Sequence, residues 1–279
     1  MSNVASIMGL AAGEKPLVWR TNLNNASYDS VSFSVSSQSA NSQGITFKPD
    51  GTKMYMCANG QRRVYQYSLS TPWDLTTVSY DNVSYYFSTI NTPLDVKFSP
   101  DGTNMYIISF DDDRFYQFTL STAWDITTAS QVYSLSFLSQ DTNGRALFFD
   151  PDGTTLFFVG GVSNGIYQYS LSTPWDLSTA SYSSISYDTY TGAGNGSLSD
   201  IYFSLNGDKM YLLGSIDYVL DYGVQEYELD TPWDISTVTP TSSFTSALLT
   251  NNRRSFSFSD RGLKVFIMDS STIYQYTSG

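Results

Sequence analysis

The sequence predicts an all-β fold, a five-bladed β-propeller whose blades each contain four antiparallel strands. Three observations lead to this prediction: two short motifs recur at nearly equal intervals, each interval divides into four strand-like segments, and the last repeat lacks a segment that the start of the chain supplies. The 279 residues include 22 Tyr, 17 Phe and 5 Trp. Aromatic side chains pack well on half-buried sheets, so this composition also favours strands.

The first motif is a turn between two strand-like segments. It reads FKPDGTKMYM at 47–56, FSPDGTNMYI at 98–107, FDPDGTTLFF at 149–158, FSLNGDKMYL at 203–212 and FSDRGLKVFI at 258–267. Its glycines follow one another at 51, 51, 54 and 55 residues: Gly51, Gly102, Gly153, Gly207 and Gly262. A strand-rich period of about 50 residues is typical of propeller blades. Within the turn, Pro fixes φ, Asp can bond the following backbone, and Gly adopts a positive φ at little cost.

The second motif is a Trp-Asp loop that occurs four times. It reads YSLSTPWDLTTVSY at 67–80, FTLSTAWDITTASQ at 118–131, YSLSTPWDLSTASY at 169–182 and YELDTPWDISTVTP at 227–240. We expect one helical turn here, with Thr71 as the N-cap, Pro72 in the first helical position and Asp74 in the third. We expect the tryptophans to be structural wedges between blades, with exposed sugar-binding platforms as the alternative; they are Trp73, Trp124, Trp175 and Trp233.

Each repeat divides into four strands. In the first repeat they are GITFKP (44–49), KMYMCA (53–58), RVYQYSL (63–69) and VSYDNVSYYFS (78–88). The third strand alternates two side-chain sets, and later repeats keep both. Because both faces keep a fixed composition, we expect each sheet to be covered on both faces by neighbouring sheets.

The ring is expected to close through the N-terminal strand. The fifth repeat stops at STIYQYTSG, the end of its third strand, while NASYDSVSFSVSS at 25–37 resembles TVSYDNVSYYFST at 77–89. We therefore expect residues 26–36 to pair with 272–277 and complete the last blade, which removes two free sheet edges. Trp19 would replace the missing loop tryptophan. The expected organisation is an N-terminal arm at 1–25 and a propeller domain at 26–279.

Composition argues against several function classes. The net charge is −12, which disfavours nucleic acid as a partner. There is no histidine, so His-based triads and His metal sites are excluded. Cys57 is the only cysteine and is expected to be a buried thiol without a disulfide. The start of the chain is a poor signal peptide and no apolar stretch spans a bilayer, so we expect no membrane insertion, and we expect no cofactor or metal.

Loops that differ between repeats are expected to share one face of the propeller, because the strands alternate in direction. Uniform turns serve folding, whereas individual loops are where a single partner is recognised. The candidate partner-binding residues on this variable face are Arg62, Arg63, Asp111, Asp112, Asp113, Arg114, Arg145, Tyr190, Tyr218, Tyr222, Arg253 and Arg254. The alternative is a solvated rim of mixed charge. The three consecutive acids lack the alternating ligand spacing of an EF-hand calcium site.

The repeats resemble those of several propeller families. FSPDGTNMYI is similar to the turn of TolB-type and lactonase-type propellers, and the Trp-Asp pair is similar to WD40 repeats but lacks their Gly-His pair. The strongest resemblance, over about 26–279, is to YQYSLSTPWD repeats of tail- or capsid-associated phage proteins. It implies a non-catalytic, virion-associated structural or host-adhesion protein that contacts other virion proteins, a host surface receptor or a glycan. The implied location is the virion, or otherwise the cell exterior or surface.

Two alternative functions stay open. One is a carbohydrate-binding, lectin-like propeller that uses aromatic platforms. The other is a propeller hydrolase of glycosidase or lactonase type, which needs convergent carboxylates. Asp95 and Asp200 begin the first strands of the second and fourth repeats, so both could approach the central channel. Glycosidases usually use a Glu as the acid, and Glu226 and Glu228 fall on an outer strand, so the sequence favours a non-catalytic protein.

Overall fold

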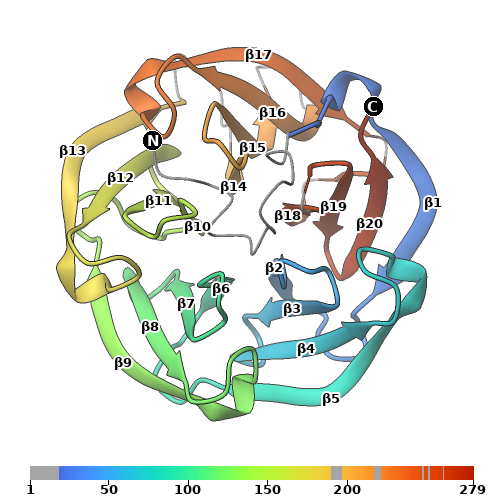
Figure 1. Cartoon of the computed structure of the whole chain (residues 1–279), viewed down its shortest axis with the longest axis horizontal. Helices are drawn as coiled ribbons and strands as arrows, with labels where there is room; N and C mark the ends of the chain where they lie inside the picture. Colours follow the sequence, from blue (N-terminus) through green and yellow to red (C-terminus); the bar gives the residue numbers. More distant parts are fainter. Residues whose placement is uncertain (1–18, 190–196, 217–220, 247, 251, 260) are drawn as a thin grey trace, which may run out of the picture.

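In the computed structural model the chain forms five four-stranded antiparallel sheets arranged as the blades of a ring (Figure 1). The structure describes residues 19–189, 197–216, 221–246, 248–250, 252–259 and 261–279. The five inner strands surround the central axis and the five outer strands form the rim. The predicted five-bladed propeller is confirmed.

The first three blades follow the expected strand pattern. Blade one contains β2 (Ser42–Phe47), β3 (Lys53–Ala58), β4 (Arg63–Leu69) and β5 (Val78–Tyr86). Blade two contains β6 (Pro93–Phe98), β7 (Asn104–Ser109), β8 (Arg114–Leu120) and β9 (Ala129–Ser136). Blade three contains β10 (Ala146–Phe149), β11 (Thr155–Val159), β12 (Gly165–Leu171) and β13 (Ala180–Asp188).

The last two blades complete the ring. Blade four contains β14 (Leu198–Phe203), β15 (Lys209–Ile216), β16 (Asp221–Leu229) and β17 (Val238–Thr245). Blade five contains β18 (Arg253–Phe258), β19 (Lys264–Asp269), β20 (Thr272–Thr277) and, as its outer strand, β1 (Ser27–Ser34).

The N-terminal strand closes the ring, as the sequence predicts. β1 pairs antiparallel with β20, with Tyr28 opposite Tyr276 and Ser34 opposite Thr272. The register shifts between Tyr28 and Val31, where two residues of β1 lie between consecutive pairs with Tyr276 and Gln275. The blue and red ends of the chain therefore lie side by side in one blade (Figure 1).

The two repeated motifs form a single packing unit. In blade three, Gly153 has a φ of +69°, and a Cβ added there would lie 2.3–2.4 Å from ring atoms of Trp175. The Trp175 backbone N–H also donates to the Gly153 carbonyl at 2.9 Å. Glycine is thus required for two reasons: the backbone is left-handed there, and the Trp175 ring leaves no room for a side chain. This contact explains why the two motifs share one period.

The helical turn in the Trp-Asp loop begins later than predicted. It is a short 3₁₀ helix in each blade: η1 (Leu23–Asn25), η2 (Leu75–Thr77), η3 (Ile126–Thr128), η4 (Leu177–Thr179) and η5 (Ile235–Thr237). The N-cap of η2 is Asp74, which accepts from the Thr76 N–H at 3.0 Å, so the assignment of Thr71 as cap was wrong. The reason is Trp73, whose φ of +61° places it outside any right-handed helix and turns its ring toward the glycine.

The hydrophobic core lies between neighbouring blades. One cluster joins Tyr55, Cys57 and Val64 of blade one to Val96 and Ile107 of blade two. Cys57 is a buried free thiol, as expected, and burial raises its pKa well above the usual value. The sheets are therefore covered on both faces, as the fixed composition of the third strands predicts. In the described part of the chain, no helix is long and apolar enough to cross a membrane.

The loop tryptophans are partly buried wedges between blades. Trp73 lies 5.3 Å from Phe47 of its own blade and 6.2 Å from Phe266 of the preceding blade, measured between ring centroids. Trp19 takes the corresponding place in blade five. Its ring lies over Gly262, and its Nε1–H donates to the Tyr211 hydroxyl at 2.8 Å. Trp19 and η1, which belong to the expected arm, thus pack on the propeller.

Candidate functional site at the centre of the ring

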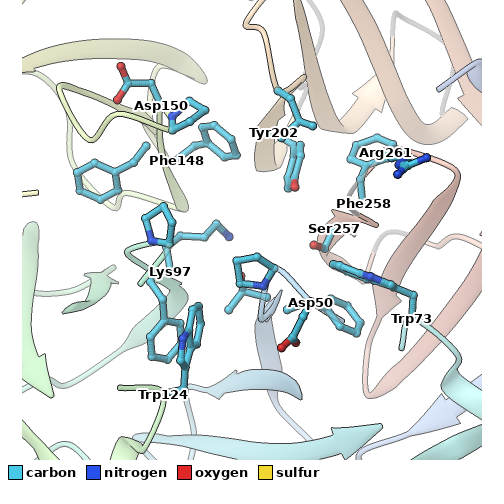
Figure 2. A pocket seen from close by; sticks show the side chains of 18 of the residues that line it. Asp50, Trp73, Lys97, Trp124, Phe148, Asp150, Tyr202, Ser257, Phe258 and Arg261 are labelled. Atoms are coloured by element: carbon cyan, nitrogen blue, oxygen red, sulfur yellow. The ribbon is translucent and has the colours of Figure 1, made fainter. Parts of the chain in front are cut away.

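A funnel of about 550 Å³ occupies the centre of the ring and opens on the face that carries the repeated turns (Figure 2). Three loop tryptophans and the prolines of three turns line its mouth: Trp73, Trp124, Trp175, Pro49, Pro100 and Pro151. One residue from each inner strand lines it more deeply, and we call this set the floor ring: Thr46, Lys97, Phe148, Tyr202 and Ser257. The wall is thus largely aromatic, and the floor ring mixes aromatic and polar side chains.

The floor ring breaks the symmetry of the repeats. Each of its members immediately precedes the repeated phenylalanine of its inner strand, as Lys97 precedes Phe98. Alternate side chains of a strand point to opposite faces, so this position is equivalent in all five blades. The phenylalanine is constant because it packs with the loop tryptophan, whereas the floor position carries five different residue types. A ligand in the funnel therefore meets a different group from every blade.

A second layer closes the funnel below the floor ring. It consists of the residues two positions earlier on each inner strand, all buried: Gly44, Asp95, Ala146, Asp200 and Ser255. Gly44 is required here, because a Cβ would lie 2.4 Å from the Asp95 carboxylate and 2.7 Å from its Cα. The small members of the layer leave room for the two acids.

The two buried acids connect neighbouring blades. Asp95 accepts from the Leu147 N–H of blade three at 3.2 Å. Asp200 accepts from the Ser255 hydroxyl at 2.6 Å and the Phe256 N–H at 2.9 Å, both in blade five. Both acids thus lie at the centre of the ring, below the funnel and bonded to backbone groups.

Lys97 is the charged member of the floor ring. Its ammonium lies 2.8 Å and 2.9 Å from the two carboxylate oxygens of Asp95, and 11% of its side chain is exposed. Burial lowers the pKa of Lys97, but the carboxylates of Asp95 and Asp200 raise it, and the net shift is upward. Burial raises the pKa of Asp200 to about 7, against the opposing effect of Lys97. Near neutral pH, Lys97 is therefore a cation at the floor of the funnel.

Charges at the funnel mouth are largely engaged in the turns. Lys48 pairs with Asp50 at 2.7 Å, and its ammonium lies 6.0 Å from the centroid of the Trp124 ring. Asp150 accepts from the Thr154 and Thr155 N–H groups at 2.8 and 3.0 Å, and burial raises its pKa. These acids hold turns in place, and the aromatic rings make the wall.

The acidic run on the variable face anchors loops. Asp111 bonds the Thr92 hydroxyl. Asp112 accepts from the backbone and side chain of Asn91 at 3.1 and 2.9 Å. Asp113 accepts from the Asn143 N–H at 2.7 Å. Among the described residues, no cluster of three or more His, Cys, Asp or Glu could hold a metal ion.

The arginines predicted as partner-binding residues lie in blades one, two, three and five. In blade one, Arg62 and Arg63 lie 5.8 and 5.3 Å from the Tyr86 ring centroid, and Arg62 also donates to the Ile90 carbonyl at 2.7 Å. In blade two, Arg114 donates to Ser134 at 3.3 Å.

Blades three and five carry the remaining predicted arginines. Arg145 lies 4.9 Å from the Phe110 ring centroid, and burial and Arg254 lower its pKa. Arg253 is buried and donates to the Ser197 carbonyl at 2.8 Å. Of the predicted tyrosines, Tyr190 and Tyr218 lie outside the described residues, and the side chain of Tyr222 is not described. A partner site on this face stays a prediction.

The floor ring was not identified from the sequence, although the signal was present. The first motif is preceded by one variable residue in each repeat, giving TFKP, KFSP, FFDP, YFSL and SFSD. Strand alternation next to a constant phenylalanine indicates a channel-facing position. The prediction instead took non-repeated loops as the only variable part of the blades.

Comparisons with known proteins identify the fold. No protein-family model matches the chain, and neither does any curated protein sequence. Among solved structures, it is similar to a "putative 6-phosphogluconolactonase" from Bacteroides uniformis, with 17% identity, a TM-score of 0.52 and coverage of 82% of this chain and 65% of that one. A protein from Lactobacillus plantarum is 14% identical, with a TM-score of 0.52 and coverage of 81% and 64%. The chain thus spans just under two thirds of either structure, and at this identity the likeness shows the fold alone.

The predicted virion role requires correction. The similar structure from Bacteroides uniformis is named as a putative lactonase and not as a virion component, so the expected role as a virion-associated structural or host-adhesion protein is withdrawn. The phage resemblance rested on the turn and Trp-Asp motifs. Both motifs are packing devices that hold a blade together, so their recurrence carries no information about where the protein works.

Proposed function

We propose that the protein binds a small carbohydrate in the central funnel. The observation that carries the proposal is the floor ring, in which five equivalent positions hold five different side chains at the base of an aromatic-walled cavity. Its volume of about 550 Å³ falls within the range of about 300–1,000 Å³ that small-molecule sites occupy.

The lining suits a sugar ring in particular. Such a ring has an apolar C–H face and a polar edge, and sites of this kind combine aromatic walls with a few placed polar groups. Trp124 and Phe148 offer apolar surface, while Lys97 and Ser257 offer polar groups at the floor. Figure 2 shows the Lys97 and Ser257 side chains directed toward the middle of the funnel.

Filling the funnel tests the proposal. Thr46 is half-buried and faces open space, so Thr46→Trp should occupy the cavity without removing packing. We expect calorimetric titration with neutral and acidic monosaccharides to detect binding to the wild type and not to Thr46→Trp. Ser79→Trp, at an exposed position of the outer strand β5, is the matched control and should bind normally. Equal binding by all three proteins would place the sugar site elsewhere.

Lactone hydrolysis is a second candidate, favoured by the Lys97 ammonium at the floor and by the name of the similar structure. When water adds to a lactone carbonyl, the oxygen becomes an oxyanion, which a fixed cation stabilises. The ring C–O bond then breaks, and the leaving oxygen takes up a proton. Acid release from glucono-1,5-lactone, measured against its spontaneous rate, tests this candidate. We expect acceleration by the wild type and its loss in Lys97→Met.

A further inference from the structure

We propose that the funnel selects a sugar carrying an oxyanion, either a carboxylate or a phosphate, and that Lys97 binds this group at the floor. This inference rests on the proposed function and names the class of its ligand. Its basis is the distribution of charge around the floor ring. Lys97 is the cation of the floor ring, while Arg261 lines the funnel outside that ring, and the two acids next to Lys97 are turned to other partners.

The acids below the floor are occupied by protein donors. Both oxygens of Asp95 contact Lys97, and they also accept from the Val96 and Leu147 N–H groups. Asp200 accepts through one oxygen from the Ile201 N–H and through the other from blade five. Since both carboxylates lie in the buried second layer, neither offers an acceptor surface to a ligand above it.

Lys97 retains donor capacity toward the cavity. An ammonium has three N–H donors, and the two Asp95 oxygens engage at most two of them. The remaining donor belongs to a side chain that lines the funnel, with its ammonium directed toward the middle (Figure 2). The hydroxyls of Thr46 and Ser257 line the same floor and can also donate. Such a set of donors fits the several acceptor oxygens of a carboxylate or a phosphate.

The charge balance also permits an anion. The Lys97–Asp95 pair is neutral as a unit, and burial keeps a large fraction of Asp200 protonated near neutral pH because its pKa is about 7. An incoming oxyanion therefore meets a neutral ion pair, whose ammonium lies toward the cavity and whose carboxylate lies in the layer below, rather than a net negative floor. The aromatic wall then packs against the rest of the sugar.

Titration calorimetry at pH 6.5 with glucose, glucuronate and glucose 6-phosphate tests the inference. A charge-assisted hydrogen bond corresponds to about tenfold or more in affinity. We expect one or both acidic sugars to bind the wild type at least about tenfold more tightly than glucose. Which acid binds distinguishes a carboxylate from a phosphate ligand. Lys97→Met should reduce the affinity for the acid to that for glucose, whereas Lys97→Arg, which keeps the charge, should retain part of the preference.

Two further variants serve as controls for the loss of the Lys97 charge. Lys97→Met leaves Asp95 without its ion pair, so the double variant Lys97→Met/Asp95→Asn removes both charges of that pair together. Lys53→Met removes a cation that pairs with Asp81 away from the funnel, and it should keep the wild-type preference. Equal binding of glucose and the acids to the wild type and to all three Lys97 variants would overturn the inference and leave carbohydrate binding intact. If none of the three sugars binds the wild type, and Thr46→Trp gives the same result as the wild type, both the inference and the proposed carbohydrate binding are overturned.

Discussion

The two faces of the propeller use sequence variation in opposite ways. On the variable face the loops differ in every blade, yet their charged side chains mostly hold the loops themselves, as Asp112 holds Asn91. On the other face the turns and Trp-Asp loops are nearly identical, yet they surround a funnel whose floor ring differs at every position. In a repeated scaffold, a candidate site can therefore be sought in constant strands as well as in variable loops. A single varying position within an otherwise constant strand is one such signal.

The largest effect is expected from removing a loop tryptophan. Trp175 packs on Gly153 and Phe149, and its carbonyl accepts from the Tyr106 hydroxyl of the preceding blade at 2.6 Å. Truncating a large packed aromatic residue costs about 3–5 kcal/mol, and we expect Trp175→Ala to lower the free energy of unfolding by about 3 kcal/mol. Denaturant titration measures this. Tyr86→Ala, which removes an exposed aromatic residue next to the variable face, should cost less than about 1 kcal/mol. Similar losses of unfolding free energy in both variants would show that the loop tryptophan is no more structural than an exposed aromatic residue.

A second prediction compares one glycine from each face. At Gly153 a methyl group meets the Trp175 ring and the φ is +69°, whereas at Gly60 the nearest atom to an added Cβ is 3.7 Å away. The left-handed backbone alone costs a non-glycine residue about 1–2 kcal/mol. We expect Gly153→Ala to destabilise the protein by about 2 kcal/mol or more, and Gly60→Ala to be nearly neutral. Thermal unfolding measures both variants. A Gly153→Ala protein as stable as the wild type would contradict the tight packing of Trp175 on Gly153.

A third prediction concerns the anchoring role of the variable loops. Burial raises the pKa of Asp112, but hydrogen bonds from Ser109, Asn91 and Tyr116 lower it, and the net shift is downward. The folded state thus binds this proton less tightly than the unfolded state, so the stabilisation is present above about pH 4 and is lost as the pH falls further. Asp112→Asn should lower the melting temperature by a few degrees at pH 7 and by less at pH 3. An equal loss at both pH values would argue against an ionised anchor.

The smallest expected effect is a pH dependence of binding at the funnel. Asp200 faces Lys97, Asp95 and the Ser255 hydroxyl, and burial raises its pKa to about 7. Below that pH the group is mostly neutral, and above it a carboxylate repels an acidic ligand. The affinity for an acidic sugar should therefore fall a few-fold between pH 6 and pH 8, and affinity for glucose should not change. Asp200→Asn should flatten the profile of the acidic sugar. A profile that keeps its slope in this variant would assign the titration to another group.

Much of the fold followed from the sequence because it depends on local, repeated signals. Glycine spacing set the number of blades, and the likeness of 25–37 to 77–89 set the ring closure. The cap of the loop helix was misassigned because the positive φ of Trp73 is a tertiary effect, stabilised by packing on Gly51 from another part of the blade.

The site was harder to predict than the fold. Lys97 and Asp95 are two residues apart on one strand, so their pairing follows from strand geometry. Asp200 reaches the same centre from blade four, more than one hundred residues later. The floor ring likewise assembles only when all five inner strands meet. No local pattern shows which alternate face of those strands encloses a cavity.

The dissociation constant of the tightest-binding sugar, measured in parallel on funnel and loop variants, tests most directly whether the funnel is the binding site. Thr46→Trp fills the funnel, whereas Arg63→Ala and Arg114→Ala remove charged side chains predicted for a partner site on the variable face. If the funnel is the site, the constant rises at least about tenfold in Thr46→Trp, a loss of about 1.4 kcal/mol of binding free energy, and stays within about twofold in the arginine variants. The reverse pattern would place ligand recognition on the variable face and contradict a binding site in the funnel.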